Sequence, residues 1–532
     1  MVFTRDIFSL VLTVNNIEMA NNKLRGKDLS KLGYTTPKSK SIALDYCNRI
    51  AKHSTKKEKI SLLEDVLLNA EKYKDHDILG KLAEEFIVVS KLASKNNIEI
   101  KTESGEFNVF GKEHVTSNTI QQMDTAMRLP IAEKGALMPD AHVGYGLPIG
   151  GVLASKNHVI PYGVGVDIGC RMSLSIYDVR PAYLDRYEYQ LVEGLKSNTA
   201  FGSGKALENP MTDDLFERPE FKEISIVKSL MKKAIQQIGS SGSGNHFVEF
   251  GKVVFEQDFQ NEQNDLNIPS GEYIGVLSHS GSRGFGAGIA EYYTRLARQL
   301  CLLPREVQHL AWLDIESEVG AEYWMAMNLA GDYAKVCHDH IHYRLGKLLG
   351  GKPIAKIENH HNFAWKEKIK GQELIVHRKG ATPAHKGELG IIPGSMIHPG
   401  YIVSGKGEEA SLNSASHGAG RQLSRSKARN IITRSELKKI LRREKVTLIG
   451  GGVDEAPIAY KNVDDIAQWT REITGKEYDR FVPFTRKLKD FDAAVDEAAA
   501  WYIRNTYPTY SKVPEAIKAI RKLPFGNFVS FP

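Results

Sequence analysis

The sequence is poor in cysteine, and its four cysteines (Cys47, Cys170, Cys301 and Cys337) are far apart, with no CxxC pair among them. That spacing argues against a disulfide framework and favours a reducing compartment, so we expect a cytoplasmic protein. Long hydrophobic runs are also missing: no stretch of about 18 apolar residues predicts a helix that spans a membrane. The short apolar run 7–14 lacks a cleavage site of small residues and does not read as a signal peptide.

Several nucleotide-binding motifs are absent as well. There is no GxxxxGK[ST] loop, which excludes a Walker-type site at the level of the motif. The stretches GYGLPIG and GVGVDIG only approximate GxGxxG and lack its strand-then-helix setting, so a dinucleotide-binding fold is poorly supported. No repeat of fixed period indicates a solenoid or propeller.

What remains is an ordinary globular composition over 532 residues, with 42% hydrophobic and 25% charged residues. The formal net charge of +7 permits an anionic partner without requiring one.

The residue pattern of the chain changes near residue 106. Before it, apolar residues spaced by three and four predict amphipathic helices, as in KSIALDYCNRIAKH and KEKISLLEDVLLNAEKY. After it, glycine clusters alternate with short β-type runs and with a long helix over 316–349. We therefore predict an α+β fold with a helical N-terminal extension (1–105), a mixed-sheet core (106–490) and a C-terminal helix with a basic tail (491–532).

Five dispersed residues are candidate metal ligands. Asp167 and Cys170 stand three residues apart on a glycine-flanked loop, where a thiolate can bridge two ions and a carboxylate can complete one shell. His246 and His279 each lie where a β-type run meets a glycine-rich loop, and His361 stands beside His360, where strand alternation predicts that only one of the pair is a ligand. Singly, each is as compatible with an ordinary core or loop histidine. Together, the set suits Zn, Mn, Fe or Co, and the residues alone do not choose among them.

A second pair of histidines is set aside as a metal site. His338 and His342 are one helical turn apart in CHDHIH, but no HExxH glutamate accompanies them. We interpret this segment as a polar, exposed helix.

His417 differs in kind from the other histidines. The Gly-Ala-Gly that follows it leaves room for a nucleotide, and an imidazole that attacks phosphorus would form a phosphoramidate. Arg421 and Arg425 could neutralise phosphate oxygens. They begin a stretch over 421–445 with ten basic and two acidic residues, which predicts either an RNA-binding stripe or the solvated face of a helix.

These motifs together resemble the RtcB-type RNA ligases, also called tRNA-splicing ligases. The matching segments run in the family's order over about residues 110–470, roughly two thirds of the chain: MPDAHVGYGLPIGG, GVGVDIGC, GSGNHFVE, SHSGSRG, AMNLAGDYA, HHN, VHRKGATPA, PGSM, SHGAGR and DEAPIAYKNVDD.

The resemblance implies an RtcB-like catalytic core that uses GTP and two Mn²⁺ ions to join RNA ends. His417 would be guanylylated, GMP would pass to an RNA 3′-phosphate, and a 5′-hydroxyl would displace it; a 2′,3′-cyclic phosphate would first be hydrolysed. The implied metal ligands are Asp167, Cys170 as the bridge, His246, His279 and His361. The implied GTP contacts are Asn245, His246, Phe247, Val248, Glu249, His361, Asn362, Pro393, Gly394, Ser395, Met396, His417, Gly418, Ala419 and Gly420.

The chain departs from the family pattern at three places. Gly400 stands where the family has a serine that contacts GTP, and the guanine-contacting lysine that ends the family pattern corresponds here to Lys487 or Lys489. The helical N-terminal extension is additional. Two rival functions stay open: a metal-dependent phosphohydrolase acting on RNA ends, and a non-catalytic RNA-binding subunit. The partners expected are RNA ends, GTP and an activating protein.

Overall fold

The computed structural model describes residues 24–32, 34, 37–84, 86, 98–202, 204–466 and, for the backbone alone, 478–483. The helix and basic tail predicted over 491–532 lie outside these residues, as do Lys487 and Lys489.

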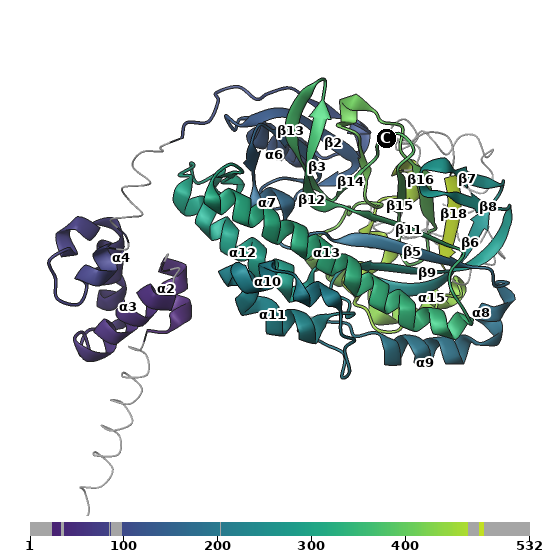
Figure 1. Ribbon diagram of the computed structural model, residues 1–532, viewed down its shortest axis with the longest axis horizontal. Helices are drawn as coiled ribbons and strands as arrows, with labels where there is room; N and C mark the ends of the chain where they lie inside the picture. The colour runs from purple at the N-terminus through teal and green to yellow at the C-terminus, as the bar shows by residue number, and fades with distance from the viewer. Residues whose placement is uncertain are drawn as a thin grey trace, which may run out of the picture.

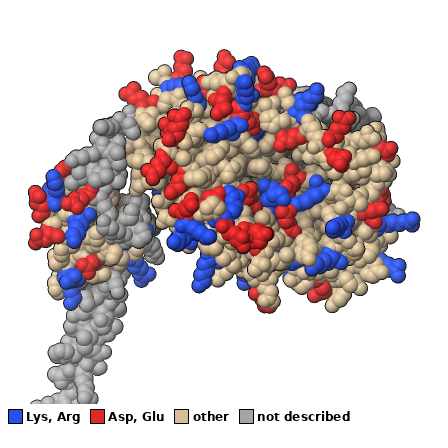
Figure 2. All heavy atoms as spheres, viewed as in Figure 1, with Lys and Arg blue, Asp and Glu red and all other residues tan. Residues whose placement is uncertain are grey.

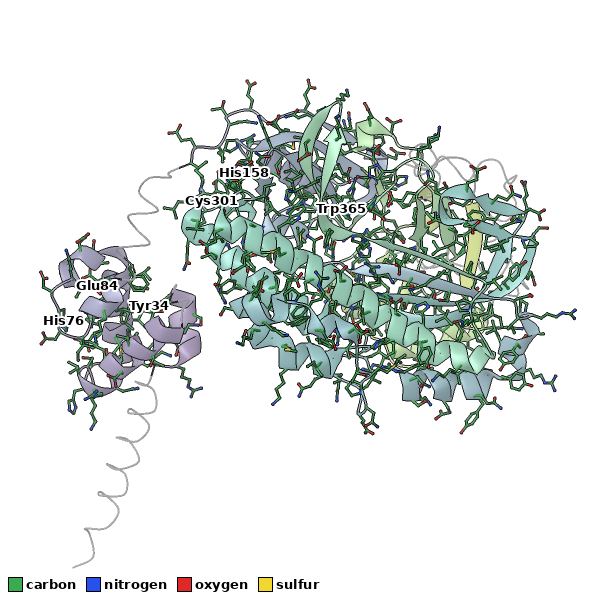
Figure 3. The ribbon with its side chains drawn as sticks, viewed as in Figure 1. Tyr34, His76, Glu84, His158, Cys301 and Trp365 are labelled. Carbon is green, nitrogen blue, oxygen red and sulfur yellow. The ribbon has the colours of Figure 1, made fainter. Side chains whose placement is uncertain are left out.

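The N-terminal part is a small helical unit with its own core (Figure 1). Its helices are α2 (Gly26–Leu32), α3 (Pro37–Arg49) and α4 (Lys56–Leu68). A capping box in which Thr55 and Glu58 bond each other's backbone fixes the start of α4. Tyr34 is fully buried among these helices, and its hydroxyl donates to the carbonyl of Leu63 at 2.9 Å (Figure 3). The described residues between 24 and 86 are therefore mainly helical.

The rest of the described chain is a mixed α/β structure built on two larger sheets. The first sheet has five strands. Neighbouring strands pair antiparallel, except the first two in the order given next, which pair parallel. In spatial order they are β1 (Phe107–Val109), β2 (Ala132–His142), β3 (Ile149–Ser155), β13 (Gln372–Lys379) and β12 (Asn362–Ile369).

The second sheet has seven strands, all paired antiparallel. In spatial order they are β11 (Ala355–His360), β5 (Arg171–Tyr177), β9 (Gly271–Ser280), β6 (Phe247–Phe255), β18 (Tyr478–Pro483), β16 (Gly400–Ser404) and β15 (Leu389–Ile392). The two sheets meet in the chain at 360–362, where β11 of one ends and β12 of the other begins.

Helices cover the second sheet on one side (Figure 1). The longest is α13 (Glu318–Gly346), which packs against β5 and β9 and against α12 (Arg283–Leu300). Ser317 caps α13 by accepting a hydrogen bond from the backbone of Gly320 at 3.1 Å. Among the described residues, no helix is both long enough and apolar enough to cross a bilayer.

Candidate active site

Five side chains meet where strands of the second sheet end, and we call them the convergent cluster: Asp167, Cys170, His246, His279 and His361. Cys170 directly precedes β5, His246 directly precedes β6, and His279 is the penultimate residue of β9. The strand register places Met172 and Phe247 on either side of His279. Antiparallel pairing therefore brings together residues that are up to 194 positions apart in the sequence.

The ligand atoms of the convergent cluster are in mutual contact around Cys170. Its Sγ lies 3.4 Å from His246 Nε2 and 3.2 Å from His279 Nε2. Asp167 Oδ2 extends the cluster on one side, at 2.9 Å from His246 Nε2. On the other side His361 Nε2 lies 3.2 Å from His279 Nε2. Cys170 thus stands between an Asp–His half and a His–His half.

The chemistry of this donor set fits divalent cations. The thiol, the carboxylate and three imidazole nitrogens point at one another, and the ligand atoms of Cys170, His246 and His279 all lie within 4.8 Å of each other. The Nδ1 atoms of His246 and His361 are buried and have no hydrogen-bond partner in the described chain. Soft and borderline ligands of this kind suit Mn, Fe, Co or Zn.

The pKa shifts within the cluster also fit the binding of divalent cations. Burial and the Asp167 carboxylate raise the pKa of the Cys170 thiol well above its ordinary value. Burial, with neighbouring histidines, lowers the pKa values of His279 and His361 well below normal. The imidazoles of His279 and His361 are therefore neutral and able to donate lone pairs, whereas the Cys170 thiolate needs a nearby positive charge to form.

Glycines keep space open around these ligands. A Cβ on Gly281 would collide with the carboxylate of Asp167, and one on Gly242 would collide with the ring of His246. Close approach of side chain to backbone requires glycine at both positions.

His417 lies beside the convergent cluster and is held by a buried aspartate. Its ring centroid is 4.9 Å from that of His361. Its Nδ1 lies 2.7 Å from Oδ2 of Asp140, which is fully buried, and its backbone N–H donates to the same oxygen at 3.2 Å. A carboxylate can only accept, so Nδ1 carries the proton and Nε2 keeps a free lone pair.

Asp140 was missed by the sequence analysis. It stands in the matching segment MPDAHVGYGLPIGG but was assigned no role of its own. The available signal was a carboxylate within the otherwise apolar run ALMPDA of residues 136–141, which the structure buries in β2. A buried carboxylate needs a partner, which makes it a candidate for orienting another group.

Asn362 links the two halves of the site. Its side chain accepts a hydrogen bond from Gly380 N at 2.8 Å and donates to the Asp167 carbonyl at 3.3 Å. A Cβ on Gly380 would lie 3.1 Å from Cε1 of His417. Asn362 therefore ties the loop of the convergent cluster to the backbone that packs on His417.

The other predicted nucleotide contacts lie on two segments. Asn245 bonds the His279 ring through its backbone, and the Phe247 ring lies 5.7 Å from that of His279. Glu249 lies on the same face of β6 as Phe247, whereas Val248 packs on the opposite face. Burial raises the pKa of Glu249 to about 8.

The second segment is the loop Pro393–Met396 between β15 and β16. A Cβ on Gly418 would lie 3.6 Å from the carbonyl of Pro393, so this loop borders the His417 loop. Ala419 is buried against β15 and β16, Gly420 adopts a positive φ of 73°, and Met396 packs on the apolar cluster under the helices of 425–443. At Gly400, a Cβ would come within 3.1 Å of the Ile392 carbonyl, which leaves little room for the family's serine.

The structure corrects the interpretation of Arg421 and Arg425 as free phosphate ligands. Arg421 donates to Glu455 at 2.9 Å and to the backbone of Leu423 and Asp454. Arg425 is paired with Asp454 at 3.0 Å and with Glu455. The remaining basic residues of this stretch lie on α14 (Arg425–Ile431) and α15 (Arg434–Arg443), except Lys445, which follows α15. On the face of the molecule in Figure 2, basic and acidic side chains are interspersed.

The expectation that His338 and His342 lie on an exposed helix is wrong. Both are buried on the side of α13 that faces the second sheet. They belong to what we call the histidine–serine chain: His338, Ser278, His342 and Ser175. His338 Nε2 donates to the Ser280 carbonyl at 3.2 Å, Ser278 Oγ lies 2.5 Å from His338 Nδ1 and 2.7 Å from His342 Nε2, and Ser175 Oγ lies 2.7 Å from His342 Nδ1.

The fold and site together define a mixed α/β protein that holds a largely buried Asp–Cys–His₃ cluster beside an imidazole held by Asp140. Comparison with known proteins then gives the family. The family profile described as "RtcB: tRNA-splicing ligase RtcB" matches residues 121–219 and 213–479. The chain belongs to the RtcB family, so the resemblance noted in its motifs is confirmed.

Individual relatives share about two thirds of the chain. It is 30% identical over 382 residues to "RNA-splicing ligase RtcB" of Escherichia coli strain K12, covering 66% of this chain and 90% of the relative. It is 31% identical over 424 residues to "tRNA-splicing ligase RtcB" of Nanoarchaeum equitans, covering 66% and 87%. For "RNA-splicing ligase RtcB homolog 1" of Entamoeba dispar the identity is 29% over 417 residues, covering 66% and 77%.

Proposed function

We propose that this protein is a GTP- and Mn²⁺-dependent RNA ligase that joins 3′-phosphate or 2′,3′-cyclic phosphate ends to 5′-hydroxyl ends through a guanylylated His417. The observation that carries the proposal is the pair Asp140–His417, which leaves Nε2 of His417 unprotonated beside a cluster of metal ligands. Membership of the RtcB family supports it. The catalytic core would span 106–490, with the helical segment 1–105 and the segment 491–532 as additions.

In the proposed first step, His417 Nε2 attacks the α-phosphorus of GTP. A nitrogen–phosphorus bond forms, the bond to the leaving pyrophosphate breaks, and the proton on Nδ1 stays with the imidazole. Asp140 stabilises the positive charge that develops on the ring, because its carboxylate accepts the Nδ1 hydrogen bond. The pyrophosphate needs neutralisation that Arg421 and Arg425 do not readily supply, since both already pair with carboxylates.

Two divalent ions, when bound, would supply that charge neutralisation and orient the phosphates. The residues that would hold them are Asp167, Cys170 and His246 for one ion, and Cys170, His279 and His361 for the other. Glu249 and Phe247 on β6 and the loop 393–396 would hold the guanosine, and the depth of Glu249 suits reading of a base edge.

In the later steps the GMP bound to His417 passes to the RNA 3′-phosphate, which breaks the nitrogen–phosphorus bond and forms a phosphoanhydride. The 5′-hydroxyl of the second RNA end then attacks the activated phosphate, GMP leaves, and a 3′–5′ phosphodiester results. A cyclic phosphate end requires prior addition of water to open the ring.

The deciding experiment incubates the protein with α-labelled GTP and Mn²⁺ and follows label on the protein. We expect acid-labile label that is lost in His417→Ala and kept in His53→Ala, a control that removes an exposed histidine of the N-terminal helical unit. RNA with a 3′-phosphate and RNA with a 5′-hydroxyl should then give joined product.

The same experiment separates the rivals. A phosphohydrolase would bind metal and release phosphate from RNA ends without ever carrying label. A non-catalytic subunit would bind RNA and do neither.

A further inference from the structure

A cavity of about 600 Å³ opens next to strand β2, immediately after Asp140. Its floor contains the buried residues Ala141 and Pro457, and exposed side chains such as Gln422 and Asn462 form its rim. None of the five residues of the convergent cluster lines it. Its volume is in the range of pockets that hold small organic groups.

The wall of this cavity is directly attached to the residues that hold His417. His142 Nδ1 lies 3.1 Å from the carbonyl of Asp140. Lys461 donates through Nζ to the carbonyls of Pro139 and Ala141, at 3.1 and 2.9 Å, and through its backbone N–H to Gly420 at 2.9 Å. The cavity therefore borders the end of the strand that carries Asp140, the residue that bonds His417.

The cations of the wall are already committed to other protein groups. Arg421 bonds Glu455 and two backbone carbonyls, and Lys461 bonds the two carbonyls of β2. Glu113 and Asp465 add negative charge to the lining. The cavity consequently lacks the loosely held positive charge that a triphosphate or a bare phosphate requires.

The cavity presents neutral rings and two side-chain amides, each with one atom that makes no hydrogen bond in the described chain. Tyr460 and His142 contribute rings to its lining, and the Arg421 guanidinium lies over one face of the Tyr460 ring, 5.1 Å from its centroid, which leaves the other face for stacking. Gln422 Nε2 donates to the Ile458 carbonyl at 3.1 Å, and Asn462 Oδ1 accepts from Asp464 N at 3.1 Å. No hydrogen bond within the described chain uses Gln422 Oε1 or Asn462 Nδ2, so an acceptor and a donor stand at the rim.

We propose that this cavity binds the terminal nucleoside of an RNA end at the junction, by stacking of the base on the rings and by hydrogen bonds to Gln422 and Asn462. Base stacking on aromatic rings with polar groups at the base edge is how proteins bind single-stranded ends. The inference rests on the proposed function and adds to it a subsite separate from the guanosine site on β6. The nucleoside can come from the 3′-phosphate end or from the 5′-hydroxyl end.

The test uses the full-length protein and compares two steps. Variants Gln422→Ala and Asn462→Asp remove one rim contact each, the latter keeping the acceptor that bonds Asp464 N, and Gln422→Trp fills the opening. The matched control is Gln260→Ala, which changes an exposed glutamine on strand β7 (Phe259–Asn261). Labelling by α-labelled GTP without RNA should stay within about twofold of wild type in all four proteins.

Joining should respond differently. With ordinary RNA ends, the rim variants should raise KM for RNA about tenfold, the equivalent of one or two hydrogen bonds to a base, and the control should not. RNA with an abasic terminal residue is then used in two arms, at the 3′-phosphate end or at the 5′-hydroxyl end. The arm in which wild type and variants become equal identifies the end that enters the cavity.

Three outcomes would overturn the inference. Unchanged KM for RNA in the rim variants and in Gln422→Trp would show that no nucleoside enters. A proportional loss of labelling would assign the cavity to GTP instead. Absence of label on the wild-type protein would remove the proposed function itself, and the cavity proposal with it.

Discussion

Two groups of histidines lie on opposite sides of strand β9. His279 points into the convergent cluster, and its neighbour Ser278 points the other way, towards His338 and His342 of α13. In the histidine–serine chain each hydrogen has one place to go: His338 donates to a carbonyl, Ser278 donates to His338, His342 donates to Ser278, and Ser175 donates to His342. The convergent cluster has no such closed pattern, because its ligand atoms face one another.

The difference shows how a cluster that could bind a metal is told apart from a structural histidine cluster. Both groups are buried, and burial lowers the pKa of a member in each, His279 and His338. Burial and histidine density therefore do not distinguish them. The distinguishing feature is that imidazole nitrogens, a thiol and a carboxylate converge on one another, whereas in the histidine–serine chain every ring nitrogen is paired with a hydroxyl or a carbonyl.

The largest effect is expected when the central atom of the convergent cluster, Sγ of Cys170, is removed. In Cys170→Ala both halves of the cluster lose a ligand, so bound Mn²⁺ should fall well below one ion per chain. RNA joining should drop by at least about 10³-fold, because several kcal/mol of charge stabilisation are lost. Metal analysis and joining rates check this, with Cys337→Ala, a buried cysteine on α13, as control. Full metal content in Cys170→Ala would refute the bridging position.

A second substitution separates metal binding from orientation of the nucleophile. Asp140→Asn should leave Mn²⁺ content intact while slowing label transfer from GTP to protein by about 10²-fold, because the amide no longer stabilises the charged ring. Rapid-quench labelling at saturating GTP measures the rate. A normal rate would mean that Asp140 serves only to hold the loop.

The histidine–serine chain should respond in stability rather than in metal. His338→Ala leaves the Ser278 hydroxyl without its acceptor and the Ser280 carbonyl without its donor, which should lower the free energy of unfolding by about 1–3 kcal/mol. At saturating Mn²⁺ the ion content should stay that of wild type. Denaturant titration and metal analysis test the two parts, and loss of metal with unchanged stability would make this chain a second ligand set.

The smallest expected effect concerns the carboxyl of Glu249, which is partly buried and belongs to neither group. The pKa of Glu249 is raised from 4.5 to about 8 by burial, so between these values the folded protein holds a proton that the unfolded chain has lost. The free energy of unfolding therefore decreases as pH rises through this window. Without nucleotide, Tm should fall with pH more steeply in wild type than in Glu249→Gln. Parallel curves would show that Glu249 is solvated.

Much of the site could be predicted from the sequence, because its residues stand in short glycine-rich segments. The ligand types at Asp167, Cys170, His246, His279 and His361 indicate metal chemistry even before their positions are known. Of the pair His360 and His361, only His361 reaches the cluster, as strand alternation predicts, while His360 packs near Phe363 and Trp365. The helices over 37–68 and 318–346 follow from their apolar spacing.

The parts that could not be predicted depend on partners distant in the chain. The polar appearance of the helix around His338 hides the fact that Ser175 and Ser278 of two strands satisfy its histidines. Arg421 and Arg425 look free until Asp454 and Glu455, some 30 residues later, fold back onto them. Asp140 acquires a role only when His417, 277 residues away, is placed against it.

The anchoring of His417 has a consequence for how substrates travel. Its ring and backbone both bond Asp140, the Gly420 carbonyl is fixed by Lys461, and Gly420 itself packs so closely on Asp140 that a methyl group would not fit. The His417 side chain is therefore fixed in position. If His417 is guanylylated as proposed, the nucleotide and the RNA end must each reach a ring whose position does not change, so the two would have to occupy this place one after the other.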